Sequence, residues 1–385
     1  MNNYTIYKHF DAILLVMFGT VIINGFINSA VVVFIALFLM VPVIVKNISL
    51  LPLKMYHFSV CLFCLFLIYP IINGSSFLYP IKYISYLISF LFGYVTCCMG
   101  ININCKKWIM FVIIFVPILH FVFIAHREGG GLFDLANTYV YYGLSVSMIY
   151  YILNIEDGKV IRRSYIIILL FILTATKLGV VFAFFLSLIF YSIRRSKNIL
   201  FIVFISMFSI ITITYIDLPI FVRIRNVFDL ASSIPLEEYV NIGDSSTNEI
   251  GKTYGNNESG ENDTSFVFRL VHWSRIMTFW INSDFLHLLF GYGDMYAKEK
   301  FAFQPHNEYV KLLFENGILV FAMFIVFVKK TFEWLCIYKI RYLFFAPLAY
   351  FFTENLLYFT TMNVAVFMSL GYLACNVNQN NIINK

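Results

Sequence analysis

A histidine–asparagine pair stands where a long polar stretch of the sequence gives way to an apolar run. His306 and Asn307 follow Pro305, which cannot continue a hydrogen-bonded turn. A histidine side chain has an ordinary pKa of about 6.5, so an imidazole can accept a proton near neutral pH. These residue types predict a general base with an amide beside it to orient a ring or a hydroxyl group. The alternative is a polar pair that only caps the following helix.

Arginine, the side chain best suited to binding phosphate, occurs in two segments that could contribute to a site. Arg269 and Arg275 lie on a predicted amphipathic helix over residues 264–281, and Arg127 precedes three consecutive glycines at 129–131. A guanidinium offers a planar fork to phosphate and stays charged, and glycine lets backbone approach a ligand closely. The arginines therefore predict an anion site, with extension toward lipid headgroups as the alternative.

Four further charges lie within or beside apolar segments. Lys177 separates two short apolar runs, and a charge near membrane depth is costly enough to suggest a function. The alternative is a hairpin tip that reaches water. Glu308, Lys311 and Glu315 follow the histidine at helical spacing and are expected to pair with one another.

The composition identifies an integral membrane protein. The chain is 61% hydrophobic and 12% charged, whereas soluble domains are about 45–50% apolar and about 25% charged. The net charge of +6 is spread in short basic clusters between apolar runs, which orients membrane helices and does not indicate nucleic acid. All seven cysteines lie in or beside apolar segments, so no metal site is expected.

The apolar runs predict an all-α, polytopic fold with about 12 transmembrane helices. Placing both termini in the cytoplasm puts the basic loops inside, as the positive-inside rule requires. The expected organisation is membrane helices 1–9 over residues 1–216, one large periplasmic loop over 217–305, and membrane helices 10–12 over 306–385. The flanks of that loop are expected to lie on the bilayer surface.

Taken together, these residues resemble the superfamily of bacterial O-antigen polymerases and O-antigen ligases. The family's motif is a His followed by Asn or Ser and, further on, a Gly; here Gly317 follows Asn307 after nine residues, and Val320 departs from the small residue or Tyr expected next. The resemblance covers roughly residues 120–330. The other matching positions are Arg127 with glycines 129–131 and Asn137, Lys177 where Arg is more usual, Arg269, and Gly291 with Gly293.

The resemblance implies a glycosyltransferase-C-type membrane fold that needs no metal or nucleotide cofactor. It implies glycan transfer from undecaprenyl diphosphate on the periplasmic face of the bacterial inner membrane. His306, Arg269 and Arg127 are then the expected catalytic residues, the histidine as base and the arginines on the diphosphate. The expected substrate-binding residues are Asn307, Lys177, Arg275 and Asn137.

Within the superfamily, we expect a polymerase that joins undecaprenyl-diphosphate-linked oligosaccharide repeat units. An O-antigen ligase, which transfers the glycan to lipid A–core, shares the motifs. A lipid-linked glycan transporter is the alternative from another class, but the charged residues cluster at one outer face and no internal repeat is visible. Membrane lipids are expected partners, a chain-length regulator is left open as a further one, and nucleic acid is not expected.

Overall fold

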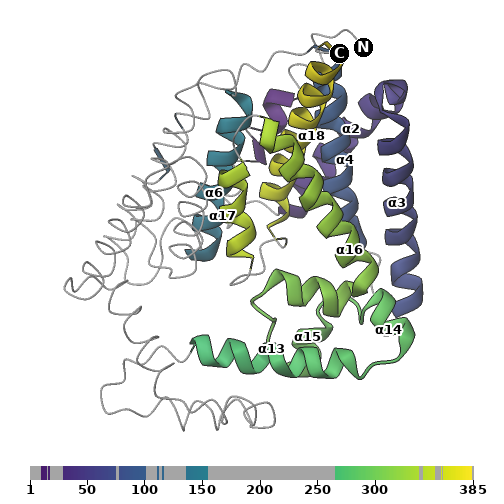
Figure 1. Cartoon of the computed structure of the whole chain (residues 1–385), viewed down its shortest axis with the longest axis vertical. Coiled ribbons are helices and arrows are strands. Elements are labelled where there is room, and N and C mark those ends of the chain that lie inside the picture. Colours follow the sequence, from purple (N-terminus) through teal and green to yellow (C-terminus); the bar gives the residue numbers. More distant parts are fainter. Residues whose placement is uncertain are drawn as a thin grey trace, which may run out of the picture. The chain divides into compact units, whose positions relative to one another are not determined.

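The computed structural model describes residues 10–14, 16–17, 29–74, 78–100, 111, 115–116, 136–154, 265–337, 341–351, 357 and 359–383. Every regular element within these ranges is helical (Figure 1). The helices are α2 (Ser29–Lys46), the 3-10 helix η1 (Ile48–Leu50), α3 (Leu53–Asn73), α4 (Leu78–Cys98), α6 (Ala136–Leu153), α13 (Ser265–Ile281), α14 (Phe285–Phe290), α15 (Tyr296–Phe301), α16 (Glu308–Ile337), α17 (Arg341–Tyr350) and α18 (Thr360–Ile383).

Four helices of the described part are long and apolar enough to cross a membrane. They cover Leu53–Asn73, Pro80–Cys98, Glu308–Leu335 and Thr360–Gln379, and a shorter apolar helix covers Val31–Lys46. This supports the expected all-helical membrane protein. The count of about 12 spans and the periplasmic loop remain predictions.

The described residues fall into two compact units. The first holds those up to residue 154 with the described parts of 323–347 and 357–383. The second holds 265–322 and 348–351. The sequence-predicted His306, Arg269 and Arg275 all belong to the second unit, which therefore contains the candidate site.

Helices α4 and α18 form the closest helix pair of the first unit. A Cβ atom added to Gly93 would overlap the carbonyl oxygen of Met368, and one added to Gly371 would overlap that of Phe90. Each glycine therefore lets the backbone of one helix touch the backbone of the other. A cysteine follows each glycine four residues later, which gives both helices the small-residue spacing typical of close packing between membrane helices.

A buried polar network fixes the same pair at another level. The Tyr86 hydroxyl donates to the carbonyl of Leu357 at 2.6 Å. The Asn363 side chain accepts from the Tyr141 hydroxyl and donates to the Tyr86 oxygen. These bonds join α4, α6 and α18, and Tyr86, Tyr141 and Asn363 satisfy one another, as a low-dielectric interior requires.

We predict that Gly93→Val destabilises the protein, because the new side chain must push α18 away from α4. Overpacking a core costs about 1–3 kcal/mol, and a clash with backbone lies at the upper end of that range. Thermal unfolding of the purified protein in detergent measures the effect. Cys61→Val, at an exposed position of α3, is the control. An unchanged melting temperature for Gly93→Val would show that the two helices do not pack as described.

Candidate active site

Helix α13 holds the segment that leads to His306. The side chain of His272 is 2% exposed, and its Nε2 donates to the carbonyl of Phe303 at 3.1 Å. The next residue, Trp273, donates its indole N–H to the carbonyl of Pro305 at 2.5 Å. The helix expected over 264–281 is thus confirmed as α13. Two adjacent side chains of that helix fix the chain immediately before the histidine.

His272 is kept neutral by its surroundings. Burial lowers its pKa below the usual value, since the charged imidazolium would lose its hydration. The hydrogen bond to Phe303 acts in the opposite direction, while electrostatic interactions with His306 and Arg275 lower the pKa of His272 further. These electrostatic effects place His306 and Arg275 in the surroundings of the same buried imidazole. Arg269 lies on the same helix, three residues before His272.

His306 adopts an unusual backbone conformation. Its φ of 50° lies in the left-handed region, which few residues other than glycine adopt. Its side chain is partly exposed, whereas that of Asn307 is buried. Such strain persists only where the surrounding structure imposes it, and it is concentrated at functional sites. Met295 and Ala302, on the segment before it, share this conformation, so the angle shows a tightly constrained segment around His306.

Asn307 is the N-cap of α16. Its side-chain oxygen accepts hydrogen bonds from the backbone N–H groups of Tyr309 at 3.0 Å and Val310 at 3.1 Å. The capping role, which the sequence left as an alternative, is thus what the structure shows for this oxygen. Capping fixes where α16 begins, and so fixes the position of the preceding histidine.

The other N–H groups of the first turn are also satisfied. The N–H of Glu308 donates to the carbonyl of Phe351 at 2.8 Å, and that of Lys311 donates to the carbonyl of Asn307 at 3.0 Å. The start of a helix often binds anions through such groups. Here all four already have acceptors, so an anionic ligand beside His306 would depend on arginine or lysine side chains.

Three charged side chains are fully buried in the first turns of α16. Glu308, Lys311 and Glu315 have no exposed side-chain surface, and Lys311 Nζ lies 3.8 Å from a carboxylate oxygen of Glu315. The expected pairing is thereby confirmed for Lys311 and Glu315. Removing one partner of a buried ion pair is strongly destabilising. Lys311 and Glu315 must therefore stay together wherever this part of α16 is buried.

Gly317 divides α16 into two parts. Its φ of 72° and ψ of 176° interrupt the helix after Asn316. The residues that follow, 318–335, are mostly apolar and would span about 27 Å as a helix. The helix as a whole, Glu308–Leu335, is long and apolar enough to cross a membrane. Its first nine residues, 308–316, form a largely buried helical segment before the interruption at Gly317.

The turn after α14 packs against this break. The N–H groups of Tyr292 and Gly293 donate to the carbonyls of Phe314 at 3.1 Å and Glu315 at 2.9 Å. A Cβ on Gly291 would overlap the backbone of Glu315, and one on Gly317 would overlap the backbone of Leu289. Gly291 and Gly317, both identified through the family resemblance, thus each lie against the backbone of the segment that carries the other. The turn thus uses the N–H groups of Tyr292 and Gly293 to hold α16.

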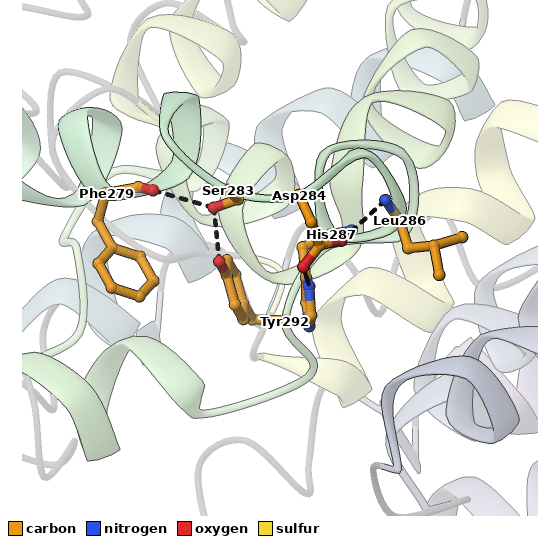
Figure 2. A network of polar contacts seen from close by, with 6 residues as sticks. All are labelled: Phe279, Ser283, Asp284, Leu286, His287 and Tyr292. Carbon is orange, nitrogen blue, oxygen red and sulfur yellow. Dashed lines mark hydrogen bonds and ion pairs between the residues drawn. The ribbon is translucent and has the colours of Figure 1, made fainter.

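A polar network that the sequence reasoning missed fixes the start of α14 (Figure 2). Asp284 caps the helix by accepting from the N–H groups of Leu286 and His287, each at 3.0 Å. The N–H of His287 is the main cause that lowers the pKa of this carboxyl. The Tyr292 hydroxyl donates to Ser283, and the Tyr292 ring stacks on that of His287. An aspartate just before an apolar run is the sequence signal for such a cap.

Three of the expected site residues cannot be placed with the others. Arg127 and Lys177 lie outside the described residues. Asn137 lies in the first turn of α6, and its side chain is outside the described part. The roles expected for these three remain predictions.

The state of His272 gives a prediction about pH. Its folded-state pKa lies below that of the unfolded chain, so below a pH of about 6.5 the unfolded state binds the proton first. Stability is therefore full at neutral pH and is lost as the pH falls through this window. Melting temperatures between pH 7.5 and 5.5 measure the loss. In His272→Gln, which keeps a donor but does not ionise, the decline should be smaller; an equal decline would assign it to other groups.

The glycine contact gives a second prediction. Gly317→Ala should lower both stability and activity, because the new methyl group meets the backbone of Leu289 and the backbone angles suit only glycine. A control is Gly74→Ala, because Gly74 also has a positive φ, its ψ of 18° is the left-handed conformation that other residues adopt at lower cost, and nothing lies near its added Cβ. Gly317→Ala should therefore cost more, and melting temperatures that fall equally in both variants would show that neither the contact with α14 nor the extended ψ of Gly317 adds to the cost.

Comparison with known proteins gives one match to a family model. A family model described as O-antigen ligase matches residues 164–325, less than half of the chain. The match includes α13, the two-glycine contact and the His306–Asn307 junction. No curated protein matches the chain. The family match supports the resemblance of this chain to the superfamily of O-antigen ligases and polymerases.

Proposed function

We propose that this chain is an O-antigen polymerase of the bacterial inner membrane. It transfers a growing glycan from one undecaprenyl diphosphate to the terminal sugar of a new lipid-linked repeat unit on the periplasmic face. The single observation that carries the proposal is the position of His306. His306 lies within the segment matched by the family model. The hydrogen bond from Trp273 of α13 to Pro305 precedes it and the Asn307 cap of α16 follows it, with Arg275 nearby.

The chemistry assigned to His306 is general base catalysis. The acceptor hydroxyl attacks the anomeric carbon of the donor, its proton passes to the imidazole, and the sugar–phosphate bond breaks. The electron pair of that bond leaves with undecaprenyl diphosphate. Because the donor carries its own leaving group, the reaction as proposed needs no metal or nucleotide.

Cationic side chains stabilise the negative charge that develops on the diphosphate leaving group. The first N–H groups of α16 already have acceptors, which favours arginines for this task. We assign Arg269 and Arg127 to the diphosphate and Arg275 and Lys177 to secondary phosphate contacts. Removing one such stabiliser typically lowers the rate by a factor of about 10² to 10³.

The two asparagines complete the assignment. Asn307 is a positioning residue in the proposal, because the oxygen that caps α16 also sets the place of the neighbouring imidazole. Asn137 is kept as a substrate contact. The proposed topology has about 12 membrane helices, a glycosyltransferase-C-type arrangement, residues 217–305 in the periplasm and both termini in the cytoplasm.

An O-antigen ligase is the second candidate, and one observation favours it: the matching family model carries that description. A ligase uses the same donor but transfers the glycan to lipid A–core. The base and the phosphate-binding arginines would be unchanged, so the acceptor alone distinguishes the two activities.

A lipopolysaccharide gel from cells that lack the protein tests the proposal. We expect a single step of core plus one repeat unit, restored to a ladder by the wild type but not by His306→Asn. Asparagine tolerates a positive φ, so this variant removes the imidazole without adding backbone strain, and its membrane level should be normal. His57→Asn, an exposed histidine of α3, is the matched control and should restore the ladder.

The other outcomes separate the alternatives. Bare core in the deletion strain would indicate a ligase, and an unchanged ladder would favour a transporter. A full ladder with His306→Asn would contradict the assignment of the base.

A further inference from the structure

Two cysteines of the first unit lie with their sulfur atoms in contact. Cys98 ends α4, Cys375 lies in α18, and their Sγ atoms are 2.9 Å apart. The neighbouring Cys97 directs its Sγ to the side-chain oxygen of Asn376 at 3.0 Å. We propose that Cys98 and Cys375 form an oxidisable thiol pair that becomes a disulfide between α4 and α18. The inference is independent of the proposed function.

The helices that carry the two thiols are held in one register. The pair of Cys98 and Cys375 is separated by 277 residues, and so is the hydrogen-bonded pair of Tyr86 and Asn363 three turns earlier. Equal separations at both levels mean that α4 and α18 run parallel without slipping. The contact between the thiols is thus built into the helix pair and does not depend on a flexible segment.

The close approach of the two backbones meets the main requirement of a disulfide. Its Cα atoms must lie within about 7 Å of each other. The two glycine contacts, at Gly93 and Gly371, press each backbone against the other one turn before the cysteines. The S–S bond length is about 2.05 Å, so the sulfur atoms need to approach by less than about 1 Å, which side-chain rotation supplies.

A metal site explains the cluster less well. Cys97, Cys98 and Cys375 are close in sequence or space, but within the described residues no group of three or more histidine, cysteine or acidic side chains is arranged to hold a metal ion. The thiol of Cys97 also interacts with Cys375, but its sulfur lies 3.0 Å from the side-chain oxygen of Asn376. The direct contact between the sulfur atoms of Cys98 and Cys375 favours a disulfide between these two residues.

The oxidation is balanced with a peroxide as the oxidant. The sulfur of Cys98, which is partly exposed, attacks one peroxide oxygen; the thiol becomes a sulfenic acid and water leaves. The fully buried Cys375 then displaces a second water and forms the S–S bond. Two thiols thus lose two electrons and two protons to hydrogen peroxide, which becomes two waters. A reducing thiol reverses the bond.

The disulfide would join α4 and α18, which are already packed against each other, by a covalent bond. A bond between partners in contact introduces little distortion, while it removes freedom from the unfolded chain. We therefore expect oxidation to raise the melting temperature. The proposed orientation puts these helix ends on the cytoplasmic side, where cellular thiols keep the pair reduced until an oxidant is present.

The full-length protein in detergent tests the inference. Hydrogen peroxide should lower the number of titratable thiols in the denatured protein by two of seven, and mass spectrometry should detect the peptide of Cys98 linked to that of Cys375. Dithiothreitol should restore both thiols. Cys98→Ser and Cys375→Ser should abolish the loss and the rise in melting temperature, whereas Cys97→Ser, adjacent in sequence, should retain both.

Two results would overturn the inference. One is an unchanged thiol count in wild type under conditions that oxidise an exposed dithiol peptide added as a standard. The other is a disulfide that links different cysteines, such as the exposed pair Cys61 and Cys64.

Discussion

The close packing of the turn at Gly291 against the interruption of α16 at Gly317 is the constraint on which the arrangement of the second unit depends. Without a side chain at either position, the turn after α14 reaches the backbone of α16 at the point where that helix is interrupted. The carbonyls of Phe314 and Glu315 find donors in the turn. The interruption divides the segment into two parts with different surroundings. The buried charged residues Glu308, Lys311 and Glu315 precede Gly317, and a mostly apolar helical part follows it. An uninterrupted membrane helix would carry these charges into lipid, where they are costly.

His306 is held from both sides by bonds that involve neither its own side chain nor a ligand. Before it, His272 and Trp273 fix the carbonyls of Phe303 and Pro305, and after it Asn307 caps α16. The left-handed backbone of His306 is what joins these two restraints. In the proposed function His306 is the base, which must be held within reach of its proton, and these neighbouring residues would provide that positioning. Since the cap and the first helical turn use their own N–H groups, the proposal assigns recognition of the diphosphate to arginine and lysine.

Local patterns in the sequence predicted part of this arrangement. The composition predicted membrane helices, the amphipathic spacing predicted α13, and the i to i+4 spacing predicted the pair of Lys311 and Glu315. Capping by Asn307 was visible as an alternative, because an asparagine before an apolar run signals a helix start. Contacts between distant segments were not predictable. Nothing local shows that the turn at Gly291 packs against α16 near Gly317, or that Cys98 meets Cys375.

The central claim is that His306 accepts the proton of the acceptor hydroxyl, and a reconstituted reaction tests it most directly. Purified protein would be given an undecaprenyl-diphosphate-linked repeat unit, and the products would be sized by mass spectrometry. We predict multiples of the unit with wild type and none with His306→Asn, although both proteins should have the same melting temperature. Equal rates of elongation by the two proteins would contradict it.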